Sequence, residues 1–196
     1  MQLKLYFDFK SPYAYLAMQP AIDLPKRFDV SMRFLPFTLR IKGKGQRSIY
    51  SEWKVRYSYM DARRWANRRG GLTIRGPRKV YDSTPSLIGA LFAQREGFFE
   101  RYSLEVFRRF FERKLEIDDA TEVAALVAEL GEDGVAYRRY LEGEGVAALE
   151  ACIEEAHADE VFGVPIFCLA GELFWGHDRI PLLEERLRER GLAREG

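Results

Sequence analysis

A strand that runs directly into a Ser-Pro helix start is the feature that most constrains how this 196-residue chain folds. Residues 2–9 alternate and are rich in Leu, Tyr and Phe, which predicts a β-strand. Ser11 and Pro12 follow, and they are typical of the N-cap and first position of a helix, which we expect to reach about Phe28. The sequence therefore places a hydroxyl at the tip of a β-to-helix turn.

A second constraint lies about 150 residues further on, where Gly163-Val164-Pro165 opens an apolar run. Proline is tolerated at the start of a strand, so we expect strands over 165–169 and 172–175 with a turn at Ala170-Gly171. A cis Val164–Pro165 bond would turn the Val164 backbone toward a peptide-like ligand, but the sequence leaves this isomer open. A last amphipathic helix is predicted over 180–190.

The middle of the chain reads as helical. After a strand at 30–37 and a Gly/Lys loop at 40–47, the pattern predicts helices at about 50–69, 84–97, 98–114, 120–130, 133–142 and 146–158. Asp119 and Glu122 are spaced as a capping box for the fourth of these. The order β-α-β, helices, β-β-α predicts an α/β protein with a thioredoxin-like fold. Its thioredoxin-like domain would cover 1–40 and 160–196, and an all-helical insertion domain would cover 41–159.

Redox members of the thioredoxin fold carry C-x-x-C at this turn, whereas here the four residues are Ser11, Pro12, Tyr13 and Ala14. The absence of a thiol excludes dithiol exchange at this position. A helix N-terminus lowers the pKa of a thiol held there, so a Ser11 hydroxyl could donate to a thiolate that arrives on a cofactor. The simpler interpretation, that Ser11 only caps the helix, stays open.

Composition narrows the function further. An apolar content of 47% indicates a globular chain, and the longest apolar run, near 161–175, is too short and broken to span a bilayer. The first residues carry no signal-peptide pattern, and two cysteines, Cys152 and Cys168, in no redox or metal spacing fit a reducing cytosol. We therefore expect a cytoplasmic protein without a membrane segment, and two histidines are too few for a histidine-based metal site. Cys168 is expected to be an inert core thiol.

Charge is unevenly spread although the net charge is only +1. Residues 40–79 hold 13 Lys and Arg against Glu52 and Asp61, whereas residues 112–160 hold 15 acidic residues against four basic ones. The favoured interpretation is that the two segments face each other or solvent; the alternative is that the basic segment attracts a small anion. No nucleic-acid-binding motif is present, so we expect no nucleic-acid partner.

Two further patterns leave alternatives open. Asp178 could cap the last helix, bind a ligand, or do both. A second set of side chains shares one face of the helix at 50–69, and a salt-bridged surface with Trp65 packed beneath is the favoured interpretation; the set is Lys54, Tyr57, Asp61, Arg64 and Trp65.

These motifs together resemble the 2-hydroxychromene-2-carboxylate isomerases, relatives of the kappa-class glutathione transferases in the DsbA-like branch of the thioredoxin fold. The resemblance runs over nearly the whole chain. It is strongest in three segments, Phe7-Asp8-Phe9-x-Ser11-Pro12-Tyr13-x-Tyr15-Leu16-Ala17, Val161-Phe162-Gly163-Val164-Pro165 and Phe174-Trp175-Gly176-x-Asp178-Arg179. Asp61-x-x-Arg64-Trp65-Ala66 resembles the insertion-helix motif of the family, and Tyr81-Asp82-Ser83 resembles its Tyr-Asn-Ser.

The resemblance implies a glutathione-dependent isomerase in which Ser11 is the catalytic residue and holds the sulfur of glutathione. Val164 and Pro165 would face the glutathione backbone. The γ-glutamyl end would be held by Trp175, Gly176, His177 and Asp178. A small aromatic carboxylate substrate would contact Lys42, Arg47, Ser48 and Tyr81. The family resemblance also implies a homodimer.

Departures from the family pattern weaken the substrate half of this assignment. His177 stands where the family has Asn or Gln, Asp82 stands where it has Asn, and residues 42–48 align poorly. The expected reaction is cis–trans isomerisation of an aromatic oxo acid by reversible thiolate addition. Two rivals are a kappa-like glutathione transferase and a non-catalytic thioredoxin-like binding protein, and a test for glutathione binding separates the second from both enzymes.

Overall fold

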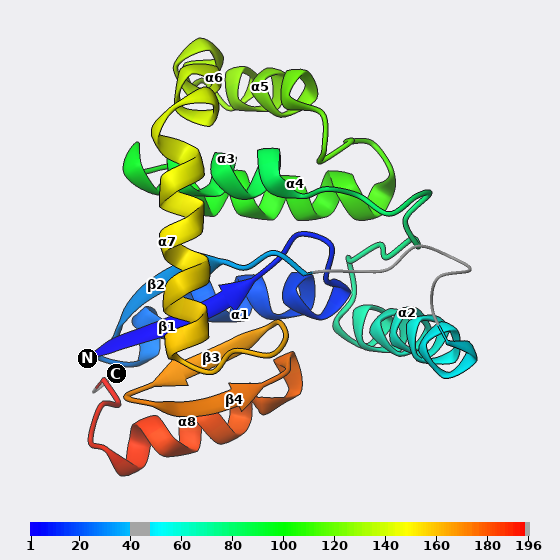
Figure 1. Ribbon diagram of the computed structural model, residues 1–196. Helices are drawn as coiled ribbons and strands as arrows, with labels where there is room; N and C mark the ends of the chain where they lie inside the picture. The colour runs from blue at the N-terminus through cyan, green and yellow to red at the C-terminus, as the bar shows by residue number, and fades with distance from the viewer. Residues whose placement is uncertain (40–47, 195–196) are drawn as a thin grey trace.

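A mixed four-stranded sheet forms the base of the computed structural model, which describes residues 1–39 and 48–194. The strand order is β2-β1-β3-β4. The strands are β1 Gln2–Phe7, β2 Ser31–Pro36, β3 Ile166–Leu169 and β4 Glu172–Trp175. All four lie within the predicted ranges, and they confirm the thioredoxin-like α/β architecture (Figure 1).

The sheet joins the two ends of the chain. β1 and β2 are parallel and are connected by α1 (Pro12–Arg27), whereas β3 pairs antiparallel with β1, with Leu5 opposite Phe167. β4 then pairs antiparallel with β3. This register brings the start of α1 and the Val164–Pro165 segment to the same end of the sheet.

Among the described residues of the insertion, the only regular elements are helices. It contains α2 Ile49–Arg69, α3 Thr84–Arg95, α4 Phe99–Glu112, α5 Ala120–Glu129, α6 Gly134–Glu142 and α7 Glu144–Ala158. Helices α3 to α6 form a stack on one side of the sheet, and α2 lies apart beside α1 (Figure 1). The chain closes with the short helix η1 (His177–Arg179) and with α8 (Ile180–Glu189). No helix in the described part of the chain is both long and apolar enough to cross a membrane.

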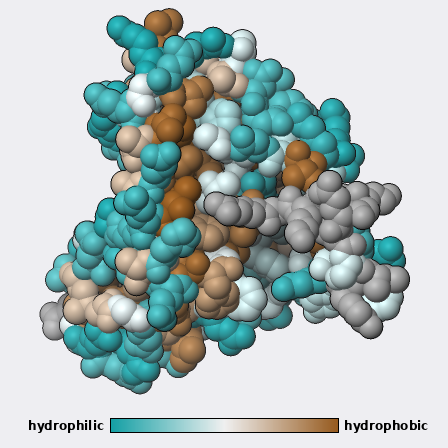
Figure 2. All heavy atoms as spheres, viewed as in Figure 1, coloured by the Kyte–Doolittle hydropathy of each residue, from teal (hydrophilic) through white to brown (hydrophobic). Residues whose placement is uncertain are grey.

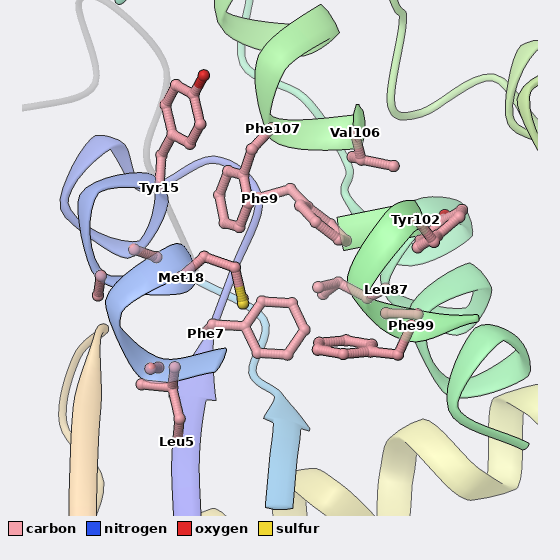
Figure 3. Close-up of a cluster of buried hydrophobic side chains, with 14 of the residues drawn as sticks. Leu5, Phe7, Phe9, Tyr15, Met18, Leu87, Phe99, Tyr102, Val106 and Phe107 are labelled. Carbon is pink, nitrogen blue, oxygen red and sulfur yellow. The ribbon is translucent and has the colours of Figure 1, made fainter. Parts of the chain in front are cut away.

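Aromatic side chains pack the insertion against the sheet (Figure 3). Phe7 and Phe9 at the end of β1 meet Phe107 of α4, with the Phe9 and Phe107 ring centroids 4.8 Å apart. Tyr15 of α1 stacks on Phe107 and Phe111 at 5.4 and 5.3 Å. Buried aromatic residues contribute about 1.5–3 kcal/mol each to burial energy, so this cluster fixes the position of α1, whose first residues carry the candidate site.

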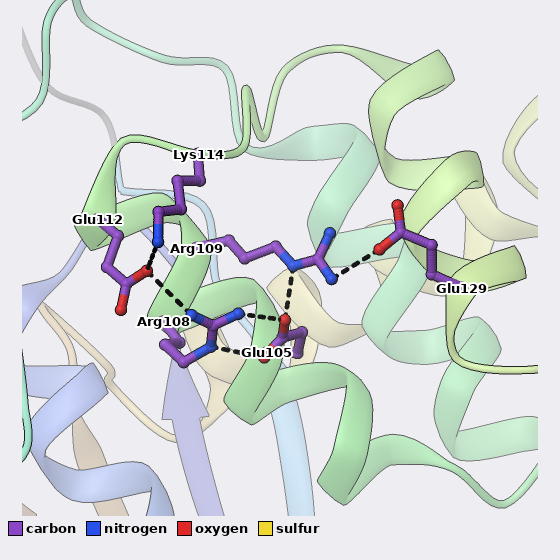
Figure 4. Close-up of polar contacts among 6 residues, drawn as sticks. All are labelled: Glu105, Arg108, Arg109, Glu112, Lys114 and Glu129. Atoms are coloured by element: carbon purple, nitrogen blue, oxygen red, sulfur yellow. Dashed lines mark hydrogen bonds and ion pairs between the residues drawn. The ribbon is translucent and has the colours of Figure 1, made fainter.

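The outer face of α4 is polar instead (Figure 4). Glu105 accepts from Arg108 and Arg109, and Arg109 also pairs with Glu129 of α5 at 2.7 Å. The hydrogen bonds from Arg108 hold the pKa of Glu105 down to about 2. Exposed ion pairs contribute about 0–1 kcal/mol each, so they add little beside the aromatic face of the same helix.

The predicted capping box of α5 is only half correct. Asp119 accepts from the backbone N–H of Thr121 at 2.7 Å and of Glu122 at 3.3 Å, as a cap should. The Glu122 carboxylate, however, accepts from the Glu116 N–H at 2.8 Å. The Asp119 N–H is already donated to the Glu116 carbonyl at 3.0 Å, so Glu122 has no donor to reach at the cap.

Helix α7 links the helical stack to the sheet (Figure 1). Its last turns pack on β1 and β2, where Asp159 accepts from Lys4 and Tyr6 at 2.6 Å each and Glu155 pairs with Arg33. The division into a thioredoxin-like domain of 1–40 and 160–196 and an insertion of 41–159 stays a prediction, because α7 contacts both parts closely.

Candidate functional site

The Ser11 turn is held from three sides. The Ser11 N–H donates to the Asp8 carbonyl at 3.0 Å, and the Ser11 Oγ accepts from the Ala14 N–H at 3.2 Å, which confirms Ser11 as the N-cap. The same hydroxyl donates to the Val164 carbonyl at 3.3 Å. This last contact joins the two segments that the sequence singled out, although they are about 150 residues apart.

A buried ion pair supports the turn from below. Asp8 is fully buried, and its carboxylate accepts from the backbone N–H groups of Lys10 and Leu39 at 2.9 and 2.7 Å. The Lys10 ammonium lies 3.4 Å from Asp8 and donates to the Leu39 carbonyl. Burial raises the pKa of Asp8, while Lys10 and these hydrogen bonds oppose the rise. Asp8 and Lys10 thus tie the residues before Ser11 to the end of β2.

The Val164–Pro165 bond is cis. The Pro165 carbonyl accepts from the Gly176 N–H at 2.9 Å, which brings the Trp175–Asp178 segment beside it. The sequence had left the isomer of this bond open, and the structure decides it.

A pocket of about 260 Å³ opens above this point. The predicted glutathione-contacting residues that line it come from the proline loop and the β4–η1 segment, and they are Val164, Pro165, Trp175, Gly176, His177 and Asp178. Ser11 is only 5% exposed and does not line the pocket, but its hydroxyl contacts the carbonyl of Val164, which does. Six of the seven residues predicted for the cofactor therefore line one pocket, and the seventh, Ser11, is hydrogen-bonded to one of the six.

His177 forms the inner wall of the pocket and is 3% exposed. Its ring stacks on Tyr13 with centroids 5.5 Å apart and meets the Trp65 ring edge-on at 4.9 Å. Arg69 contacts its Nδ1 at 3.5 Å. Burial, together with the Arg69 charge, lowers the pKa of His177 to about 4, so the ring is neutral near pH 7.

Asp178 does not cap the last helix, contrary to one of the two interpretations of the sequence. The N-cap of α8 is Arg179, and no side chain bonds to the free N–H groups there. The Asp178 carboxylate instead pairs with Arg179 at 3.3 Å, and both side chains line the pocket. Gly176 permits this arrangement, because its φ is +114° and an added Cβ would lie 2.4 Å from the Asp178 carboxylate.

The two predicted substrate residues that the structure describes, Ser48 and Tyr81, do not line this pocket. Lys42 and Arg47 lie outside the described residues. Ser48 is the N-cap of α2 and accepts from the Ser51 N–H at 3.2 Å. Tyr81 is buried, and its hydroxyl donates to Glu116 at 3.2 Å. The assignment of these four residues to a substrate stays a prediction.

Four pocket residues were not predicted as site residues: Tyr13, Asp61, Trp65 and Arg179. The Tyr13 hydroxyl donates to Asp61 of α2 at 3.0 Å, and burial together with this bond raises its pKa. The sequence did place Asp61 and Trp65 on one helix face. The favoured interpretation of that face is wrong for Asp61, whose partner is the Tyr13 hydroxyl of α1. It is confirmed for Trp65, which is packed against the core and meets His177.

The charged segments meet in one place among the described residues. Lys79 pairs with Asp118 at 2.9 Å and with Glu116 at 3.3 Å. Other acidic residues of 112–160 pair with basic residues from elsewhere, such as Lys4 with Asp159 and Arg101 with Glu132. Mutual neutralisation of the two segments is therefore only partly confirmed.

The other features that could form a functional site are the two cysteines, a metal-binding cluster and a second hollow. Cys152 and Cys168 are free and buried, and burial raises the pKa of both thiols, that of Cys152 to about 11. This confirms Cys168 as a core thiol. In the described part of the chain, no three acidic, His or Cys side chains are grouped to hold a metal ion. A hollow of about 370 Å³ between α3 and α6 is larger, but it lies apart from Ser11 and is lined by Arg95, Arg139 and Tyr140 among others.

Comparison with known proteins identifies the family to which the chain is similar. The model of the DSBA-like thioredoxin domain matches residues 2–188. A 2-hydroxychromene-2-carboxylate isomerase of Pseudomonas putida is 32% identical over 95% of this chain and 94% of its own length. The chain belongs to this isomerase family of DsbA-like proteins. A second 2-hydroxychromene-2-carboxylate isomerase, from a Pseudomonas strain, is 30% identical to this family member over 91% of the chain and 86% of its own length.

Solved structures place the isomerase-family chain in the same fold. A 2-hydroxychromene-2-carboxylate isomerase structure superposes with a TM-score of 0.81 at 26% identity, covering 96% of this chain and 95% of the other. A cytosolic disulfide reductase, DsbM of Pseudomonas aeruginosa, superposes with a TM-score of 0.67 at 18% identity, covering 96% of this chain and 99% of the other. The second likeness shows the fold alone, and the turn from Ser11 to Ala14 of this family member carries no thiol.

Proposed function

We propose that this protein is a glutathione-dependent cis–trans isomerase acting on 2-hydroxychromene-2-carboxylate or a related aromatic oxo acid. The observation that carries the proposal is the contact between the Ser11 hydroxyl and the Val164 carbonyl beneath the pocket. It sets a single hydroxyl donor at the N-terminus of α1, where a thiolate is stabilised and no protein thiol is present. The isomerase names of the relatives support the reaction class.

The pocket residues fit glutathione. The tripeptide carries a thiol, an ammonium group and two carboxylates. The pocket offers the Asp178 carboxylate and the Arg179 guanidinium, and the Ser11 hydroxyl contacts Val164 in its lining. The volume of about 260 Å³ is close to the lower end of small-molecule sites, roughly 300 Å³, so part of an extended tripeptide would lie outside the pocket. A protein of the same fold, the Pseudomonas aeruginosa DsbM, has been solved with GSH.

Ser11 can exchange partners at little cost. Its bond to the Val164 carbonyl is 3.3 Å long, beyond the usual 2.5–3.0 Å for a hydroxyl donor, and is therefore weak. A hydrogen bond to a charged acceptor is about twice as strong as a neutral one, so the hydroxyl would turn from the carbonyl to a thiolate. The Tyr13 N–H has no acceptor within the helix and faces the same end of α1.

When bound, glutathione would supply a thiolate for reversible addition to a conjugated carbon of the substrate, which would let the former double bond rotate. The protein holds negative charge at the α1 N-terminus in both directions, with Ser11 as the donor. Tyr13, Trp65 and His177 form an uncharged wall of the pocket. We assign Lys42, Arg47, Ser48 and Tyr81 to the substrate carboxylate and ring, as the family resemblance implies.

A kappa-like glutathione transferase is the second candidate, and the position of Tyr81 favours it. The Tyr81 hydroxyl is directed to Glu116, and this residue does not line the pocket. A transferase needs no clamp for a substrate carboxylate. The two enzymes are separated by whether the substrate is recovered as its geometric isomer or remains attached to glutathione.

We further propose that the protein acts in the cytoplasm as a homodimer. The two cysteines are free, as in proteins of reducing compartments. An apolar band follows α7 on the face shown in Figure 2. Val146 of α7 is 46% exposed. Sedimentation of the protein and of Val146→Glu tests the dimer: a dimer that dissociates in the variant supports this face, and a monomeric wild-type protein rejects the proposal.

The function is tested by following the ultraviolet spectrum of 2-hydroxychromene-2-carboxylate with and without glutathione. We expect isomerisation only with glutathione present, and no accumulation of a glutathione conjugate. Conjugate accumulation would instead establish the transferase. If glutathione does not raise the melting temperature at all, the protein is not a glutathione enzyme.

A further inference from the structure

A proline in the middle of α1 creates an unusual acceptor. Pro20 lies inside the helix and has no N–H, so it cannot close the bond to the carbonyl four residues earlier, that of Leu16. Leu16 is fully buried, and a buried carbonyl without a donor is costly. The carbonyl is satisfied from outside the helix by the Nη1 of Arg69, near the end of α2.

This bond orients the rest of the guanidinium. The guanidinium is planar and rigid, so fixing Nη1 on the Leu16 carbonyl also fixes the direction of Nη2. Nη2 lies 3.5 Å from the Nδ1 of His177 in the pocket wall. A guanidinium has only donors and stays protonated, so the Nδ1 of His177 must accept this bond.

We propose that Arg69 is a positioning residue that holds His177 as the neutral tautomer with its proton on Nε2, so that His177 presents an N–H donor to an oxygen atom of the bound ligand. A neutral imidazole carries one proton, and with Nδ1 accepting, that proton sits on Nε2. The two ring nitrogens point in divergent directions, so the Nε2–H is turned away from Arg69.

The surroundings of the ring keep it in this state. Tyr13 of α1 covers one face and Trp65 of α2 meets it edge-on. The charged groups around it are Arg69, which opposes a second proton, and Asp61 and Asp178, which favour one. Burial and Arg69 together outweigh the two carboxylates, because the pKa of His177 falls to about 4. The tautomer is independent of the proposed function, whereas the role of the Nε2–H toward a ligand carboxylate rests on it.

Nitrogen-15 NMR of the histidine side chains tests the tautomer directly in the full-length protein. The chain has two histidines, and the exposed His157 on α7 supplies a reference in the same sample. We expect His177 to show a protonated Nε2 and an unprotonated Nδ1 at pH 7. A proton on Nδ1, or a mixture of the two forms, would overturn the proposal whatever happens to any variant.

Arg69→Ala, with Arg63→Ala as the control on the same helix, tests the cause. We expect Arg69→Ala to give a mixture of tautomers and a titration midpoint of His177 that moves up toward the ordinary value of about 6.5, while Arg63→Ala changes neither. An unchanged spectrum in a folded Arg69→Ala protein would contradict the role of Arg69. If this variant does not fold, the wild-type spectrum still decides the tautomer.

Adding glutathione as the probe tests the donor role. We expect the Nε2–H resonance of His177 to shift while that of His157 does not. Arg69→Ala should weaken glutathione binding by roughly twofold, because a mixture of tautomers lowers the fraction of rings that carry the Nε2–H. Binding without a shift at His177 would reject the donor role alone. A complete lack of glutathione binding, with the tautomer as predicted, would reject the proposed function and leave the tautomer assignment intact.

Discussion

Helices α4 and α2 come from the same insertion, but one builds the scaffold and the other builds the pocket. Seven side chains of α4 are buried, and its aromatic face packs against β1 and α1. Among the described side chains of the longer α2, only Ala62 and Ala66 are buried, while Trp53, Tyr57 and Met60 are exposed. Helix α2 instead delivers Asp61, Trp65 and Arg69 to the pocket or its back wall. The comparison teaches that a weakly packed helix can still be placed accurately through a few polar and aromatic contacts.

The largest expected effect lies on the scaffold side. Phe107→Ala removes the ring that contacts Phe9 and Tyr15, and it should lower the free energy of unfolding by about 3–5 kcal/mol. Urea unfolding measures this. Arg108→Ala on the outer face of α4 is the control and should cost less than about 1 kcal/mol. Similar losses for the two variants would show that the aromatic face of α4 does not stabilise the fold more than its polar face does.

The next effect lies on the pocket side, where we expect a large loss of activity and only a small loss of stability. Ser11→Ala removes the hydroxyl donor at the α1 N-terminus and should lower kcat/KM by roughly a hundredfold or more. It removes a cap as well, which should cost only about 1 kcal/mol of stability. Steady-state kinetics and thermal unfolding are compared on the same sample. Unchanged turnover in the folded variant would reduce Ser11 to a helix cap.

The pocket residue His177 makes the stability of the whole fold depend on pH. Its pKa of about 4 in the folded protein lies below the ordinary value of about 6.5, so between these values the unfolded chain binds a proton that the folded chain does not. This contribution to stability is complete above pH 6.5 and is lost as the pH falls toward 4, by on the order of 2 kcal/mol. The difference between wild-type and His177→Gln unfolding curves isolates it from other titrating groups. A constant difference across this range would mean that His177 is not held neutral.

Trp65→Ala asks whether α2 acts on the ligand without contributing much to the core. It removes the ring that meets His177 edge-on and should weaken glutathione binding about tenfold, or about 1.4 kcal/mol. Trp53→Ala, on the same helix and 52% exposed, is the matched control and should leave the dissociation constant nearly unchanged. Calorimetry gives both constants, and equal effects would show that α2 matters as a whole rather than through its pocket face.

The smallest effect is expected at the rim. Asp178→Asn removes a carboxylate that would face the ammonium group of glutathione, but this side chain is 43% exposed and already paired with Arg179. Screening by solvent therefore limits the loss to about 1 kcal/mol, several-fold in the dissociation constant. An unaltered constant would leave Asp178 without a part in binding.

The sequence predicted the scaffold almost completely and the pocket in part. Three features were predicted from patterns within one short segment each: the apolar period of α4, the Ser11-Pro12 helix start and the strand at Pro165. Such patterns determine secondary structure without reference to the rest of the chain. The bond from Ser11 to Val164 was foreseeable only through the resemblance, because periodicity carries no information on long-range contacts. Asp61, Trp65 and Arg69 were placed on the right helix but given no role in the site, since the side that α2 turns to α1 depends on tertiary packing. The link from Pro20 to Arg69 required the structure, although the missing N–H is visible in the sequence.

A crystal structure of the protein with glutathione tests the central claim most directly. The account predicts that the sulfur lies within hydrogen-bond reach of the Ser11 Oγ, with the peptide backbone beside Val164 and the γ-glutamyl end near His177 and Asp178. Glutathione bound with its sulfur away from Ser11, or bound in the hollow beside Arg95 and Tyr140 instead, would contradict it.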